Sequence, residues 1–519
     1  MSNCHSIRPL PGPGPEYRGR EPRIHCNRAA TPHTDDKPAR KLWLGLLIVA
    51  VAVGGVCRVR QYLTRTSYWN DEAFVVLNIV DHPASWMLGP LDYNQAAPPA
   101  FMWVEQTAAH ALGTGEYALR LFPLLSGVGA LVLFAVLSWR VIPGPAAMFA
   151  TGWFAAAEKL VSYSAELKQY SSDAVVAVLL MLVAIGGNRR GRASSRFLAV
   201  AAITAVAVWL SHPAVIVFAA LSLGLALACW RQGWSGRAKW IAGNLLVLAS
   251  FAALYRISIV REQDPFLYRF WADGFPPLGR PLDVPGWLFS QLYGLVRQPF
   301  TTLKALTGAL AIVGLVDLVR QRRALLLTAC VAPVVLTILA AFAGKYPFYP
   351  SRLTMFLLPG LLLLCGAGAR LLMAPDDARL RWAGAVLPIG LLGFGLTTAA
   401  GRLVHPHFNS HIRPVVEYVR AHRKPGEALY LLGQPNSDPQ TPWGRHMEFL
   451  CYWRNPDPPR AMTLPTADRL PARFWIVYPF TPGHPTDFIK PALDKANSNA
   501  GRVDYFLDKH GGAAYLFAR

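Results

Sequence analysis

The chain has 519 residues, of which 53% are hydrophobic and only 16% are charged, and its mean hydropathy is +0.28. This balance argues against an ordinary soluble globular protein and favours a membrane protein. The net charge of +21 comes from Lys and Arg spread through short loops between apolar runs. That spread argues against a nucleic-acid partner, which needs one basic face, and is typical of cytoplasmic loops.

The first 41 residues are rich in Pro and Arg and contain no apolar run. They predict a disordered cytoplasmic tail over residues 1–41 and not a signal peptide. The seven cysteines form no CxxC pair, so we expect neither a disulfide framework nor a zinc site; they are Cys4, Cys26, Cys57, Cys229, Cys330, Cys365 and Cys451.

A helix that crosses a hydrocarbon core about 30 Å thick needs roughly 20 apolar residues. About eleven runs come near that length, at 42–57, 118–139, 144–162, 172–187, 197–211, 213–230, 239–258, 303–319, 324–343, 353–373 and 380–398. They predict an all-α polytopic membrane domain over residues 42–400. Basic residues recur in alternate loops, which places the amino terminus in the cytoplasm. Arg58, Arg60 and Arg65 are exceptions on the predicted outer side, where they would meet anionic headgroups or phosphates.

Residues 401–519 change to a mixed polar sequence. Within them, 427–432 and 474–478 read as buried strands, and 415–420 reads as a short helix. We predict a small soluble α/β domain, which an odd number of spans would place outside the cytoplasm. The whole chain is thus expected in the cell (inner) membrane.

The first outer loop, about 58–117, contains the sequence Tyr68-Trp-Asn-Asp-Glu-Ala73. Asn70 could cap a helix whose first turn carries Asp71 and Glu72, which would make both acids structural. The pair follows an aromatic residue at a membrane face, however, and an apolar neighbourhood can tune a carboxylate for proton transfer. A short apolar helix at 100–112 is expected to lie along the interface.

Two later outer loops carry charges close to predicted spans. The segment 163–173 contains Glu166 and Lys168, which are either interfacial anchors or groups that face a polar cavity. The loop 345–352 ends in Arg352, whose guanidinium suits a phosphate.

The order of these motifs along the chain is similar to that in a known family. An aromatic-x-Asp-Glu loop is followed by a Pro-Pro helix, a Glu-Tyr-x-Leu-Arg-Leu helix start, a Tyr-Ser-x-Glu-x-Lys-x-Tyr loop and a late Tyr-Pro-x-Tyr-x-x-Arg loop. Over about residues 42–400 this order resembles the protein O-mannosyltransferase and aminoarabinose transferase superfamily, polytopic glycosyltransferases of the C-type (GT-C) fold.

The resemblance implies transfer of a sugar from a polyprenyl-phosphate donor to an acceptor on the outer face, with inversion at the anomeric carbon. An acidic residue of the first outer loop is the base in that family; Asp71 matches its position and Glu72 lies beside it. The departing phosphate gains negative charge, so cations should surround it. The substrate-binding candidates are Tyr163, Glu166, Lys168, Tyr170, His212, Tyr346 and Arg352, with Lys168 and Arg352 in the cationic role.

The chain also departs from the family pattern. Ala97-Pro-Pro99 stands where many members have His-Pro-Pro. His212 could compensate, although a lone histidine at a helix junction is also a common structural residue. The aromatic-rich segment 264–273 could cover the donor or form an ordinary interfacial belt. We predict no cofactor and no obligatory metal, but the sequence does not decide whether a divalent metal takes part.

Two other classes compete with the enzyme. A polytopic transporter or lipid flippase would also need many spans, but Asp, Glu and Lys are nearly absent from the span interiors. A scaffold whose C-terminal domain binds a partner would leave the polar outer loops unexplained. The sugar, the lipid carrier and the acceptor stay open, and the acceptor can be a protein, a lipid or a glycan.

Overall fold

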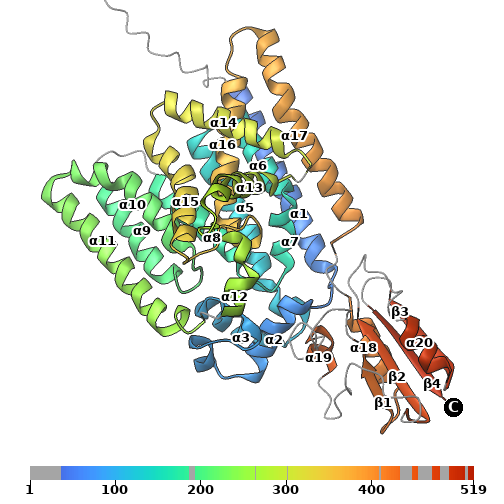
Figure 1. Cartoon of the computed structure of the whole chain (residues 1–519). Coiled ribbons are helices and arrows are strands. Elements are labelled where there is room, and N and C mark those ends of the chain that lie inside the picture. The colour runs from blue at the N-terminus through green and yellow to red at the C-terminus, as the bar shows by residue number, and fades with distance from the viewer. Residues whose placement is uncertain are drawn as a thin grey trace, which may run out of the picture.

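The computed structural model describes residues 37–185, 193–262, 265–300, 302–407, 411–432, 447–453, 470–479, 490–498, 500–508 and 512–518. Most of the predicted tail, residues 1–36, and the basic loop around Arg189 lie outside the described residues. Figure 1 shows a large helical bundle with a smaller α/β domain at one end, the fold class predicted from the sequence.

Helices lie over all eleven predicted apolar runs. They are α1 (Lys37–Leu63), α5 (Leu121–Val141), α6 (Pro145–Ala156), α8 (Tyr170–Ile185), α9 (Ala193–Ala207), α10 (Ala214–Trp230), α11 (Gly233–Leu254), α14 (Lys304–Arg320), α15 (Ala324–Phe342), α16 (Leu358–Leu372) and α17 (Ala378–Val404). Within the described residues six helices are long and apolar enough to cross a membrane, or seven if one bent pair counts as a span. The chain is therefore a multi-pass membrane protein, but the count of eleven spans is not established.

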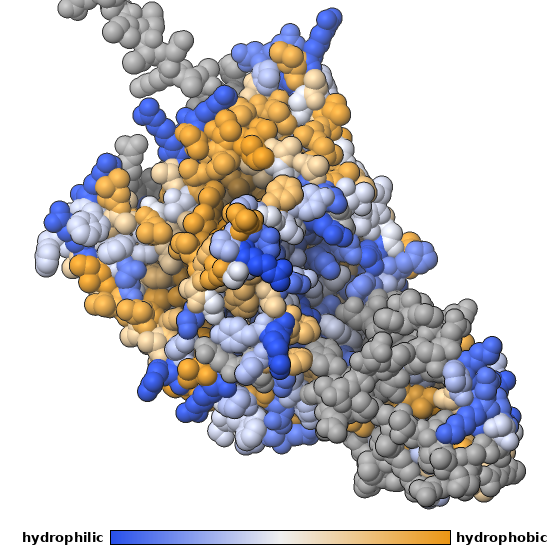
Figure 2. All heavy atoms as spheres, viewed as in Figure 1, coloured by the Kyte–Doolittle hydropathy of each residue, from blue (hydrophilic) through white to orange (hydrophobic). Residues whose placement is uncertain are grey.

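Small residues let the helices approach closely. A Cβ at Gly314 of α14 would lie 1.8 Å from the Leu364 carbonyl oxygen of α16, and one at Gly54 of α1 would lie 2.6 Å from Ala155 Cβ. Without a hydrophobic driving force inside lipid, such close backbone packing holds helices together. Figure 2 shows apolar side chains gathered over the body of the bundle, while hydrophilic side chains gather toward its ends.

Arg58 is placed differently from the sequence prediction. We expected it just beyond the first span, but α1 continues to Leu63 and Arg58 is fully buried within it. Its Nη1 donates to the carbonyl oxygens of Gly54 at 2.9 Å and Ala155 at 3.2 Å, and its Nη2 donates to that of Phe154 at 3.2 Å. The last two carbonyls belong to the C-terminal turn of α6, where the helix dipole is negative, so this cation is stabilised without a carboxylate.

Short helices connect the long ones, and Figure 1 shows α2 and α3 at the end of the bundle that lies beside the C-terminal domain. They include α2 (Asn70–Asp81), α3 (Pro99–Leu112), α4 (Glu116–Leu119), α7 (Glu158–Ser162), η3 (Tyr163–Ala165), α12 (Pro265–Phe270), η6 (Ala272–Gly274), α13 (Val284–Arg297) and η8 (Arg352–Leu357). Helix α2 begins at Asn70, so Asn70 is its first residue and Trp69 is its N-cap. The Trp69 amide donates to Glu72 Oε2 at 3.4 Å, a contact that helps to start the helix.

The C-terminal domain is a four-stranded mixed sheet covered by helices. Its elements are α18 (Arg413–His422), β1 (Ala428–Leu431), α19 (Met447–Trp453), β2 (Arg473–Pro479), α20 (Lys490–Asn497), β3 (Gly501–Asp508) and β4 (Gly512–Ala518). The strand order is β1-β2-β4-β3; β1 pairs parallel to β2 with Leu429 opposite Trp475, and the other pairs are antiparallel. Both predicted strands and the predicted helix are present within one or two residues.

Candidate active site

Asp71 is the point at which the three loops that carry Asp71, Lys168 and Arg352 meet. Its carboxylate lies in the first turn of α2 and is only 3% exposed. Arg352 Nη1 forms an ion pair with Oδ2, and Lys168 Nζ lies 4.0 Å from Oδ1. Residues separated by nearly 300 positions therefore place one carboxylate between two cations.

Lys168 reaches Asp71 because the chain turns sharply before α8. The axes of Glu158–Ala165 and Tyr170–Ile185 differ by 118°, and Lys168 lies in the break between them. Its Nζ donates to Gln95 Oε1 at 2.7 Å. Tyr93 and Asn94, just before Gln95, have positive φ angles of 64° and 54°. Consecutive residues in this strained region persist only where tertiary contacts hold them.

Arg352 is surrounded by aromatic rings. It begins η8, and its guanidinium carbon lies 5.7 Å from the ring centroid of Trp69, 6.0 Å from Tyr170 and 5.2 Å from Trp271. The negative faces of the three rings attract the cation. They hold it in place while its side chain keeps 15% of its surface exposed.

Glu72, the neighbour of Asp71, is fully buried and tied to Arg120. Arg120 Nε donates to Oε1 at 2.8 Å and Nη2 to Oε2 at 2.6 Å, and the Leu167 amide also donates to Oε1 at 2.7 Å. Arg120 further donates to the Thr66 carbonyl oxygen at 2.6 Å. This paired arrangement fixes the first turn of α2 against the loop that carries Lys168.

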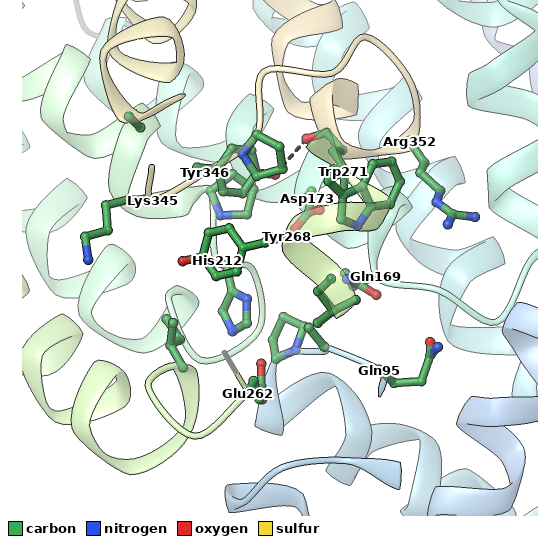
Figure 3. A pocket seen from close by; sticks show the side chains of 18 of the residues that line it. Gln95, Gln169, Asp173, His212, Glu262, Tyr268, Trp271, Lys345, Tyr346 and Arg352 are labelled. Atoms are coloured by element: carbon green, nitrogen blue, oxygen red, sulfur yellow. Dashed lines mark hydrogen bonds between the residues drawn. The ribbon is translucent and has the colours of Figure 1, made fainter. Parts of the chain in front are cut away.

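A cavity of about 760 Å³ opens beside Asp71. One part of its wall is polar, with Asp71, Gln95, Lys168 and Arg352. Figure 3 shows Arg352, Gln169 and Gln95 on one side, and His212, Glu262 and Lys345 on the other. Helices α10 and α11 contribute apolar side chains, which are Val215, Ile216, Phe251 and Ala252. A wall that joins apolar helices to paired cations suits an amphiphile with an anionic headgroup.

His212 and Glu262 line this cavity outside the spanning helices, and burial shifts the pKa of each. Desolvation lowers the pKa of His212 to about 4, so the imidazole is neutral near pH 7. Desolvation also raises the pKa of Glu262 to about 7, against the opposing effect of the Ser258 hydroxyl, which donates to Oε1 at 2.7 Å. Within the described residues, His212 Nε2 has no hydrogen-bond partner. A neutral imidazole with a free ring nitrogen in the cavity wall can form a hydrogen bond with a ligand.

Of the remaining candidates predicted from the sequence, two line the cavity and two do not. Tyr170 and Tyr346 line the cavity, and the Tyr346 hydroxyl donates to the Leu353 carbonyl oxygen at 2.7 Å. Tyr163 packs edge-on against Tyr170, with ring centroids 5.2 Å apart, but neither Tyr163 nor Glu166 is among the residues that line the cavity.

Sequence reasoning assigned no role to Arg120 or Gln95, and it considered Trp271 only as part of the segment 264–273, which could cover the donor or form an interfacial belt. Arg120 lies in the Glu-Tyr-x-Leu-Arg-Leu motif, and Trp271 lies in the aromatic-rich segment. Both residues therefore belong to segments that the sequence analysis had singled out. Gln95 lies two residues before the variant Ala97-Pro-Pro99, and that variation is the one signal that could have drawn attention to it.

A second cavity of about 1170 Å³ adjoins the first. Tyr268 and Phe275 line both cavities, so the segment between them forms a shared wall. Trp271 in this wall contacts Arg352 on one side and Tyr349, which lines the second cavity, on the other, with its ring centroid 5.6 Å from that of Tyr349.

No family model matches the sequence, and no curated protein matches it. Among solved structures, the chain is similar to ArnT from Cupriavidus metallidurans bound to undecaprenyl phosphate, with a TM-score of 0.52, 13% identity and coverage of 91% of this chain and 98% of that chain. The apo state of the same protein gives a TM-score of 0.50 at 13% identity with the same coverage. An Archaeoglobus fulgidus oligosaccharyltransferase in complex with Zn and sulfate gives 0.48 at 12% identity, covering 91% of this chain and 73% of that chain. The likeness to the two ArnT structures confirms the predicted GT-C fold.

Proposed function

We propose that this GT-C-fold protein is a membrane glycosyltransferase that moves a sugar from a polyprenyl-phosphate donor to an acceptor on the outer (periplasmic) face. The observation that carries the proposal is the cavity in which Asp71 lies between Lys168 and Arg352 while α10 and α11 supply an apolar wall. The apolar wall suits the polyprenyl chain, and the two cations suit its phosphate. The undecaprenyl phosphate bound to the similar ArnT structure supports this choice of donor.

In the proposed reaction Asp71 is the base. The acceptor hydroxyl or amine attacks the anomeric carbon and gives its proton to the Asp71 carboxylate, while the bond from that carbon to the phosphate oxygen breaks with inversion. The electron pair leaves with the lipid phosphate, whose added charge Lys168 and Arg352 stabilise. The positive charge is supplied by the chain itself, so the proposal needs no resident metal.

The contacts of Asp71 suggest how the base is released. Asp71 is paired with Arg352. Lys168 lies close to Asp71 and also donates a hydrogen bond to Gln95. A donor phosphate would compete for both cations and so free the Asp71 carboxylate to accept a proton. Glu72 is held by Arg120, so we assign it to positioning Asp71 and not to proton transfer.

The second cavity gives the acceptor a route to the donor that is separate from the lipid-binding part of the first cavity. If the lipid occupies the apolar part of the first cavity, the acceptor must arrive from another direction. The aromatic wall around Trp271 separates the two cavities next to Arg352, so movement of this wall would bring the acceptor to the donor. Such closure around a bound substrate is common in transferases.

The test is sugar transfer by the purified protein in proteoliposomes with radiolabelled polyprenyl-phosphate sugars. Asp71→Asn should lower kcat by at least 100-fold, the usual range for loss of a general base. Asp81→Asn is the matched control, because Asp81 lies at the exposed end of the same helix. If the wild type moves labelled lipid across the bilayer but transfers no sugar, the protein is a flippase; if Asp71→Asn retains full activity, the base is elsewhere.

A further inference from the structure

Tyr452 of the C-terminal domain contacts the loop that precedes Asp71. Tyr452 of α19 accepts a hydrogen bond from the Tyr68 amide at 2.7 Å, and its hydroxyl donates to Glu116 Oε1 at 2.7 Å. The two tyrosine rings stack with centroids 5.7 Å apart. Burial raises the pKa of Tyr452 well above its ordinary value, so the hydroxyl keeps the proton that it donates.

Glu116 is the centre of this contact. Its side chain is 2% exposed, and Oε1 also accepts from Arg413 Nη1 at 2.7 Å, while Oε2 accepts from Arg65 Nε at 3.3 Å. The Arg413 amide donates to Ser67 Oγ at 2.9 Å. One buried carboxylate therefore binds two cations, one from each side of the domain boundary, with charge-assisted hydrogen bonds.

The contact continues to the base through side chains. The Tyr68 ring lies 5.2 Å from the Arg120 guanidinium carbon, and Arg120 holds Glu72 at 2.8 and 2.6 Å. Glu72 is next to Asp71 in the first turn of α2. The segment before α2 has no regular structure, and Arg65 within it has a φ of 48°, which external contacts must hold.

We propose that the C-terminal domain positions the catalytic base, with Tyr452 and Glu116 as the positioning residues. The domain is then a working part of the transferase, and it acts through the segment 65–72 without touching substrate. The reason is geometric: a displacement of about 1 Å at a reacting group can cost about 100-fold in rate. The effect on rate rests on the proposed function, whereas the effect on the conformation of the loop does not.

Tyr452→Phe is the sharpest test, because it keeps the ring stack and removes only the hydroxyl. The Tyr68 amide and Glu116 each lose a partner, so we expect kcat to fall about 10- to 100-fold. The KM for the lipid donor should stay within about twofold, because Tyr452 does not line the donor cavity. Tyr505→Phe is the control, because Tyr505 is an exposed tyrosine of β3 in the same domain.

Hydrogen–deuterium exchange of residues 64–73 gives a reading that needs no activity. Tyr452→Phe should speed exchange there, and Tyr505→Phe should not. Unchanged exchange together with unchanged kcat would overturn the proposal. If the wild type transfers no sugar, the function fails but exchange still decides the role of the domain. If Tyr452→Phe does not yield folded protein, Glu116→Gln, which keeps the shape and removes the charge, serves in the same two measurements.

Discussion

At the scale of single residues, Arg352 combines an ion pair with contacts to three aromatic rings. It pairs with Asp71 and is enclosed by the rings of Trp69, Tyr170 and Trp271. A planar guanidinium can stack on rings and bind a phosphate with two parallel hydrogen bonds, whereas the ammonium of lysine cannot.

We therefore expect Arg352→Lys to raise the KM for the lipid donor about tenfold or more although the charge is kept, because the bidentate contact and the stacking are both lost. Donor titrations of transfer activity would show this. Lys304→Arg is the control, because Lys304 lies against Tyr293 outside the donor cavity and should leave the KM unchanged. An unchanged KM in Arg352→Lys would remove Arg352 from the phosphate site.

Glu262 makes stability depend on pH in the opposite sense to an ordinary carboxylate. Its pKa in the folded protein is about 7, above the value of about 4.5 expected in the unfolded chain. Between these values the folded state binds more protons, so its stability is full below about pH 4.5 and falls as pH rises through 7, by on the order of 3 kcal/mol.

Melting temperatures in detergent at pH 5 and pH 8 would measure this loss. Glu262→Gln should reduce the difference between the two pH values, because the amide does not titrate. If the variant and the wild type lose the same amount, other groups carry the dependence.

The sequence identified Asp71, Lys168 and Arg352 because each is a charge next to an apolar run, and such charges need a reason. It assigned no role to Arg120, and it did not link Trp271 to Arg352. Their partners, Glu72 and Arg352, lie 48 and 81 positions away, and only the tertiary structure joins them. Tyr163 and Glu166 carried the same sequence signal as Lys168, and a count of residues along the loop could not tell which side chains would face the cavity.

At the scale of elements, the first turn of α2 depends on the buried pair of Glu72 and Arg120. Removing one partner of such a pair leaves an uncompensated charge, which typically costs about 3–5 kcal/mol. Glu72→Gln should therefore lower the melting temperature by several degrees. Asp283→Asn is the matched control, because Asp283 faces Arg280 at 3.9 Å with 57% of its side chain exposed and should have almost no effect. Equal melting temperatures in the two variants would contradict the assignment.

Apolar runs predicted the long helices well, since length and composition alone define them. They did not predict the 118° turn before α8. The runs 144–162 and 172–187 each read as a span, yet α6 has 12 residues and ends at Ala156. The remainder of the first run forms α7, and η3 follows it; the position of both is set by packing and not by local sequence. That turn is what brings Lys168 to Asp71.

At the scale of the whole molecule, the proposed orientation places the C-terminal domain outside the cytoplasm and the α16–α17 turn inside. A membrane-impermeant maleimide applied to cells with a permeable outer membrane should label Val503→Cys in exposed β3 but not Asp376→Cys. The described native cysteines are buried, so replacing Cys4 and Cys26 with Ser gives a low background. Labelling of Asp376→Cys before the cells are broken would reverse the orientation.

The small C-terminal α/β fold was predictable because the composition changes near residue 400. Its contact with the helical bundle was not. Tyr452 and Arg413, which contact Glu116, lie 336 and 297 positions away from it along the chain. Nothing in the sequence around a buried acid such as Glu116 identifies residues so distant as its partners.

Arg58 has a consequence for the order in which the protein is made. The Ala155 carbonyl that it binds is 97 residues further along the chain. At a synthesis rate of about 5–20 residues per second, α6 follows α1 by about 5–20 seconds. During that interval the arginine has only its own helix as a partner, which disfavours release into lipid. We expect α1 to stay with the insertion machinery until α6 emerges, and Arg58→Leu to leave it earlier in a site-specific crosslinking series of nascent chains.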